Sequence, residues 1–129
     1  MKPMGNATVF EGELAFFWFD ASGILCALSK DTPRTLERQQ KNYVFVKHIT
    51  GKKKVCLLAD TSKTARQDRA TREYMAEELP HLFIAIAVIS AAIPATFFIN
   101  LFLALKQQPI PIKFFNSEEK AKAWLKTYL

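Results

Sequence analysis

The stretch that decides the fold is LFIAIAVISAAIPATFFINLFLAL, residues 82–105, which contains no charged side chain. It supplies the ~20 apolar residues that a membrane-spanning helix needs. Its first part, Leu82–Ile89, is rich in β-branched residues, which are typical of a strand buried on both faces. Ser90–Pro94 then brings small residues and a proline, which a helix accommodates only in its first turn. We therefore expect a buried strand followed by a buried helix, although hydropathy alone does not separate this arrangement from one long span.

Further strands are predicted on both sides of this stretch. The apolar runs Leu14–Phe19 and Ile24–Leu28 flank the turn cluster Asp20–Gly23, in which glycine tolerates a positive φ, so they predict a β-hairpin. Val55–Ala59 and Ile112–Phe115 are short apolar runs between helical segments, and each predicts one more strand.

Two helices are predicted between the hairpin and the apolar stretch. The first begins at Asp31-Thr32-Pro33, with a capping side chain before a proline, and ends at Gly51. Its expected inner face is only partly apolar and consists of Leu36, Gln40, Tyr43, Val44 and Lys47. The second helix covers Thr64–Leu79, begins with the capping-box pair Thr64 and Gln67, and is expected to end at Pro80.

A final helix follows the last predicted strand. Asn116 and Glu119 have capping-box spacing, and the carboxylates of Glu118 and Glu119 suit the positive end of the helix dipole. A stripe at i, i+3, i+4 and i+7 spacing predicts the buried face, which is formed by Ala121, Trp124, Leu125 and Tyr128.

The order of these elements, ββαβαβαβα, predicts one α/β domain over residues 1–129. Its sheet is expected to have about five strands, mostly parallel, with the N-terminal hairpin at one edge and four helices. Residues 1–13 are expected to form a poorly structured lead-in.

The pattern resembles the SpoIIAA-like fold of STAS domains, which is related to the Sec14 lipid-binding proteins, and looks most like a group of uncharacterised bacterial STAS/SEC14-like proteins. The resembling stretches are Phe16–Leu28, Val55–Asp60, Thr64–Ala70, Ile110–Asn116 and Glu119–Leu125. The resemblance implies that both halves of residues 82–105 are buried in the domain, which argues against a membrane span.

The phosphorylation switch of that family is not implied here. Its anti-sigma-factor antagonists carry an Asp-Ser-Ser-Gly-type motif at the start of a helix, whereas the comparable stretch here is Asp68-Arg69-Ala70-Thr71. The serine and glycine positions of the motif are replaced, so the resemblance implies a STAS-type module without the usual phosphoserine switch.

Composition indicates an ordinary globular protein. The net charge is +6, with basic residues scattered along the chain, and the two cysteines, Cys26 and Cys56, lie in apolar strands where a reduced, buried thiol is expected. Met1–Glu13 has no apolar core of the kind found in a signal peptide. We therefore expect a cytoplasmic protein, with a location peripheral to the inner membrane as the alternative.

One candidate binding site lies at the end of a strand. Asp60, Thr61 and Ser62 follow the predicted strand Val55–Ala59 and precede a helix, and ligands of open α/β sheets bind at this edge. The same residue types also form turns and helix caps, so both interpretations remain open.

A second candidate is the helix expected at Pro94–Lys106, which is apolar around its whole circumference and therefore needs cover on every side. A five-stranded sheet covers one side only. A second copy of the chain, another protein or a lipid is expected to cover the rest. The candidate contact residues are Asn100, Phe97, Phe98, Leu101 and Phe102.

No catalytic, cofactor or metal motif occurs in the sequence. His48 and His81 lack neighbours at metal-ligand spacing, and aromatic residues are not interleaved with basic ones as single-stranded nucleic-acid binding requires. We therefore expect a non-catalytic regulatory or protein-interaction module, without cofactor or nucleic acid, and a homodimer or protein complex formed through the Pro94–Lys106 helix. The alternative is an apolar small-ligand or lipid-binding protein that works at the membrane surface.

Overall fold

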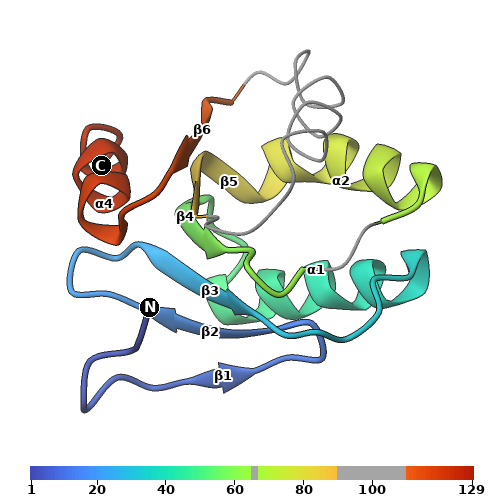
Figure 1. Cartoon of the computed structure of the whole chain (residues 1–129), viewed down its shortest axis with the longest axis horizontal. Coiled ribbons are helices and arrows are strands. Elements are labelled where there is room, and N and C mark those ends of the chain that lie inside the picture. The colour runs from blue at the N-terminus through green and yellow to red at the C-terminus, as the bar shows by residue number, and fades with distance from the viewer. Residues whose placement is uncertain (65–66, 90–109) are drawn as a thin grey trace.

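A six-stranded mixed sheet forms the centre of the molecule in the computed structural model, which describes residues 1–64, 67–89 and 110–129 (Figure 1). The strand order follows the chain, and the first two pairs are antiparallel while the last three are parallel. The strands are β1 (Phe10–Glu11), β2 (Ala15–Phe19), β3 (Leu25–Ser29), β4 (Val55–Asp60), β5 (Phe83–Ile89) and β6 (Ile112–Phe115).

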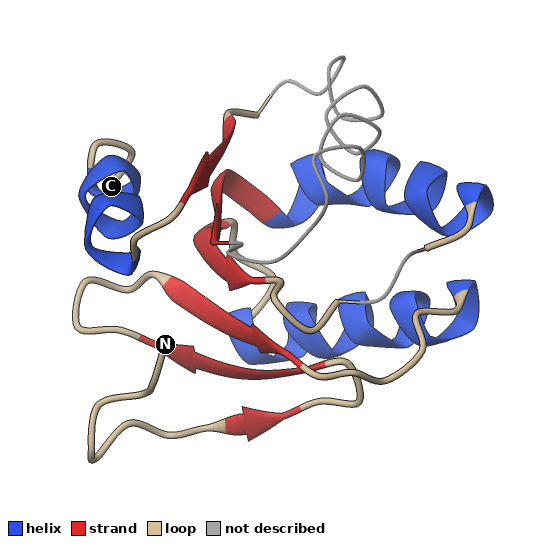
Figure 2. Cartoon of the chain, in the orientation of Figure 1, coloured by secondary structure: helices blue, strands red, loops and turns tan. Residues whose placement is uncertain are grey.

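The described helices cover both faces of this sheet. Helices α1 (Leu36–Thr50) and α2 (Arg69–Leu82) lie on one face, and α4 (Glu118–Lys126) lies on the other (Figures 1 and 2). The α/β architecture predicted from the sequence is therefore confirmed.

The alternation of side chains along the strands produces two separate cores. In β4, Leu57 packs with residues of α1 and α2, whereas its neighbours Cys56 and Leu58 pack with Ala121 and Leu125 of α4. Both faces of β4 are apolar, so neither face of the sheet can be left to solvent.

The predicted turns that depend on glycine are present. Gly23 has a φ of +85° in the hairpin between β2 and β3, where Asp20 Oδ1 accepts hydrogen bonds from the N–H groups of Ser22 and Ile24, each at 2.9 Å. Gly51 ends α1 with a φ of +64°, a conformation that only glycine adopts without strain.

The sheet has one more strand than the sequence predicts. Phe10–Glu11 forms β1 within the stretch expected to be a poorly structured lead-in, and it pairs with Phe16 and Phe17 of β2. A strand of two residues is too short to show an alternating pattern in the sequence, so only its pairing with β2 identifies it.

Three predicted helix starts are wrong by a few residues. Helix α1 is capped by Thr35 instead of Asp31, α2 by Asp68 instead of Thr64, and α4 by Ser117 instead of Asn116. Each region contains several residues that are able to cap, and packing against the sheet decides which one begins the helix.

Two further helix predictions are corrected by tertiary packing. Pro80 does not end α2, which continues to Leu82 because Leu79 and Leu82 are both buried against the sheet. The buried face of α1 contains Gln39, Tyr43 and Val46, whereas Val44, which we expected to be buried, is 68% exposed.

The helix expected at residues 94–106 lies outside the described residues. Within the described part of the chain, no helix is both long enough and apolar enough to cross a membrane.

The docking of α4 gives a test of the second core. Replacing the fully buried Leu125 with alanine should lower the free energy of unfolding by about 2–5 kcal/mol, since it leaves a cavity against β4. The same change at Leu129, which is 61% exposed, should alter it by less than about 0.5 kcal/mol. Urea unfolding followed by circular dichroism measures both, and equal effects would show that α4 does not pack on the sheet.

The two cysteines give a second test. Burial raises the pKa of the Cys26 thiol to about 11, and it also raises the pKa of Cys56; both thiols are free. Because the thiolate is the reactive form, native protein at pH 8 should react with a disulfide reagent at least about 100-fold more slowly than urea-unfolded protein. Fast labelling of both thiols without unfolding would contradict the burial.

Candidate functional site

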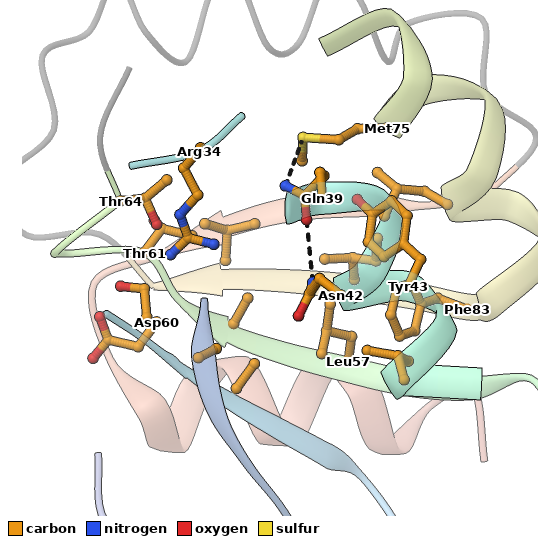
Figure 3. A pocket seen from close by; sticks show the side chains of 18 of the residues that line it. Arg34, Gln39, Asn42, Tyr43, Leu57, Asp60, Thr61, Thr64, Met75 and Phe83 are labelled. Carbon is orange, nitrogen blue, oxygen red and sulfur yellow. Dashed lines mark hydrogen bonds between the residues drawn. The ribbon is translucent and has the colours of Figure 1, made fainter. Parts of the chain in front are cut away.

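A cavity of about 140 Å³ lies between the sheet and helices α1 and α2 (Figure 3). Its floor is the sheet face that these helices cover, and its polar groups come from α1 and from the segments around the strand ends. It is lined by Ala15, Phe17, Ala27, Ser29, Arg34, Gln39, Asn42, Tyr43, Val46, Leu57, Ala59, Asp60, Thr61, Thr64, Gln67, Met75, Leu79, Phe83, Ile86, Val88 and Ile112.

The hollow exists because the floor side chains become smaller towards the carboxyl ends of the parallel strands. Along β3 the inward side chains change from Leu25 to Ala27 to Ser29, and along β4 they change from Leu57 to Ala59. Ala27 and Ala59 are direct neighbours across the two strands. The residues that flank this pair in the same row, Phe17 and Val88, are larger.

Helix α1 contributes a polar wall. Gln39, Asn42, Tyr43 and Val46 fall at i, i+3, i+4 and i+7, which places them on one face of the helix. Gln39 is only 2% exposed although its side chain is polar. A buried amide needs hydrogen-bond partners, so the interactions of this wall decide what the cavity is able to accept.

The amides of this wall are incompletely satisfied. Gln39 Nε2 donates to the sulfur of Met75 at 3.3 Å, and Asn42 Nδ2 donates to Gln39 Oε1 at 3.1 Å (Figure 3). The remaining oxygen, Asn42 Oδ1, is buried and has no hydrogen-bond partner in the described structure.

Arg34 brings a positive charge into the same cavity. It precedes α1, and its Nη2 donates to the carbonyl oxygens of Leu14 at 2.9 Å and Lys30 at 3.1 Å. Its Nε is buried without a hydrogen-bond partner among the described residues. Burial lowers the pKa of the guanidinium, because removal from water disfavours the charged form.

Tyr43 closes the apolar side of the wall. Its ring stacks on Tyr74 of α2, with the ring centroids 5.7 Å apart. Burial raises the pKa of the Tyr43 phenol far above its usual value, and the nearby Tyr74 adds to this shift, so the phenol is neutral at physiological pH.

The strand-end site predicted from the sequence is divided between the cavity and the solvent. Asp60 and Thr61 line the cavity, whereas Ser62 is exposed and does not. Both lining residues also stabilise the turn: Asp60 Oδ1 accepts from the Ser62 N–H at 3.0 Å, and the Thr61 hydroxyl donates to the carbonyl of Ile89 at 3.3 Å.

The other predicted contact residues, Asn100, Phe97, Phe98, Leu101 and Phe102, lie outside the described residues. The described residues also contain no group of three or more His, Cys, Asp or Glu side chains that could share a metal ion.

Sequence reasoning missed Arg34, Gln39 and Asn42. The helical spacing of Gln39, Asn42, Tyr43 and Val46 is visible in the sequence, but it competes with the more apolar neighbouring stripe that includes Leu36. No sequence pattern predicts that Arg34 lines the cavity, because its position depends on the path of the segment between the end of β3 and the start of α1.

Comparison with known proteins adds a family relationship. No curated protein matches the chain at a significant level. A family model described as a domain of unknown function (DUF7793) matches residues 17–129, a range that includes every cavity-lining residue except Ala15. Since the match covers most of the sheet and all three described helices, the chain belongs to the DUF7793 family.

Proposed function

We propose that this chain is a non-catalytic binding module that holds a small, largely apolar molecule in the cavity between the sheet and helices α1 and α2. The observation that carries the proposal is the hollow over Ala27 and Ala59 between the sheet and the helices. A concave, mostly apolar space with a few polar groups is the usual form of a small-molecule site.

The size of the cavity sets the size of the ligand. Its volume, about 140 Å³, is close to the ~150 Å³ of an engineered apolar cavity that binds benzene. A body of about one six-membered ring therefore fits.

The lining supports binding more than catalysis. The ionisable side chains among the described lining residues are Arg34, Tyr43 and Asp60, and Tyr43 is held neutral by burial. The rest of the lining offers apolar contact and amide or hydroxyl hydrogen bonds, which orient a bound molecule.

The resemblance to SpoIIAA-like and Sec14-like domains supports a binding role as well. We also propose that the fold is SpoIIAA-like in its topology, with a fourth helix at residues 94–106. The proposed location is the cytoplasm or the inner membrane surface. The protein-interaction hypothesis depends on that same helix and stays a prediction.

Toluene is a suitable probe of the proposal because it matches the cavity in size and carries no polar group. It should bind with a Kd on the order of 0.1–1 mM and shift the amide NMR signals of Ala27, Asn42 and Ala59. Ala27→Leu fills the hollow and should abolish these shifts, with Ala59→Leu as an independent second filling variant.

Ala123→Leu is the matched control, since it adds the same side chain at an exposed position of α4. It should leave toluene binding unchanged. The proposal is wrong if toluene produces no shifts in the native protein, or if it binds both folded filling variants as well as the native protein.

A further inference from the structure

The polar end of the cavity carries a cation that has no acidic partner. Among the described residues, Arg34 forms no ion pair within 4.0 Å, and its two hydrogen bonds use the same nitrogen, Nη2. The ranges that the structure does not describe, 65–66 and 90–109, contain neither Asp nor Glu in the sequence. No carboxylate of the described residues therefore lies within ion-pair distance of this guanidinium, although Asp60 lines the same cavity.

The neighbouring arginine shows the contrast. Arg38, one helical turn further along, pairs with Glu13 through its Nε at 2.7 Å. By contrast, the Nε–H of Arg34 is buried and donates no hydrogen bond to any described group. A buried N–H of a charged group left without an acceptor costs about 1–3 kcal/mol or more, so a bound group that accepts a hydrogen bond from Nε is favoured here.

Asn42 adds a second unsatisfied atom of the opposite kind. Its Oδ1 is a buried acceptor, whereas Arg34 Nε is a buried donor, and both residues line the same cavity (Figure 3). A ligand that binds both atoms must accept a hydrogen bond from Arg34 Nε and donate one to Asn42 Oδ1.

Building on the proposed function, we infer that the ligand is a small monocarboxylic acid with an apolar body of about one ring and a second group that bears an O–H or N–H. The carboxylate binds the Arg34 guanidinium, the ring lies over Ala27 and Ala59, and the second group donates to Asn42 Oδ1. The assignment follows from charge complementarity, because the Nε–H of Arg34 is free to donate a charge-assisted hydrogen bond to a carboxylate oxygen while Nη2 stays bound to the two backbone carbonyls.

Asp60 restricts the charge of the ligand. Its carboxylate also lines the cavity, and only one of its oxygens has a described hydrogen bond, from the Ser62 N–H. With Asp60 and a monoanion the cavity holds two negative charges against the one positive charge of Arg34, and a phosphate dianion or dicarboxylate would add a third, so a monoanion is favoured.

Three probes of similar size separate the parts of this inference. Benzoate carries the carboxylate, benzamide is its neutral counterpart, and toluene has neither group. In the native protein at pH 7, benzoate should bind about ten- to a hundredfold more tightly than benzamide, as measured by isothermal titration or by amide NMR shifts.

Arginine variants test the residue. Arg34→Met should reduce the preference for benzoate over benzamide to less than about threefold while toluene still binds. Arg38→Met removes the same charge outside the cavity and should leave the preference intact. If Arg34→Met does not fold, Arg34→Gln provides the measurement, since glutamine keeps a polar side chain but removes the charge and should lose most of the preference.

Hydroxylated probes test the second contact. Either 3- or 4-hydroxybenzoate should bind the native protein about three- to tenfold more tightly than benzoate, and Asn42→Leu should remove this gain. The Asn42 contact is wrong if neither hydroxybenzoate gains over benzoate in the native protein.

The outcomes distinguish the inference from the proposed function. If toluene binds but benzoate has no preference over benzamide, or keeps it in Arg34→Met, the carboxylate assignment is overturned and the binding module stands. If toluene does not bind the native protein, the proposed function itself fails.

Discussion

The structure depends on the burial of strands that are apolar on both faces. β4 directs Cys56 and Leu58 to one side and Leu57 and Ala59 to the other, and β5 is buried along most of its length. At ~25 cal/mol per Å² of apolar surface, leaving either face in water would remove much of the driving force for folding. Helices must therefore cover both faces, and the parallel pairing of β3, β4 and β5 follows from the connections through α1 and α2.

The same layer contains the hollow that we interpret as a binding site. A helix packed on a sheet is straight on the scale of a few turns, so its distance from the sheet cannot follow a floor whose side chains shrink from leucine to alanine. The space over Ala27 and Ala59 consequently stays open at the end of the sheet where β3 and β4 finish. Ligands of α/β proteins are usually found at this end of the parallel strands.

The polar groups around the hollow work against stability. Gln39 is buried with a methionine sulfur as its acceptor, and Arg34 keeps its charge in a place where burial lowers the pKa of the guanidinium. Natural proteins tolerate such costs mainly at functional sites, where local stability is given up for recognition. The partly buried arginine and the shrinking floor are independent features of the structure, and the ligand that we propose, apolar at one end and anionic at the other, accounts for both.

Patterns within short segments determined much of the fold. The hairpin around Gly23, the stop of α1 at Gly51, the strand at Ile112–Phe115 and the α/β class are all readable from the sequence, because turn chemistry and apolar periodicity act over a few residues. The strand-end position of Asp60 and Thr61 was readable for the same reason. The sequence did not predict which face of α1 is buried or that α2 continues past Pro80, because packing against the sheet outweighs local preference in both helices.

The cavity itself was decided only by the tertiary structure. Arg34, Asp60 and Met75 come from a connecting segment, a strand end and a helix, and nothing in their own neighbourhoods in the sequence relates them to one another. The sequence by itself determined that an apolar α/β core would form and, to within one residue, where the strands β2 to β4 would end. Which polar side chains face the hollow was determined by strand register and helix packing, because these bring together residues that are far apart in the chain.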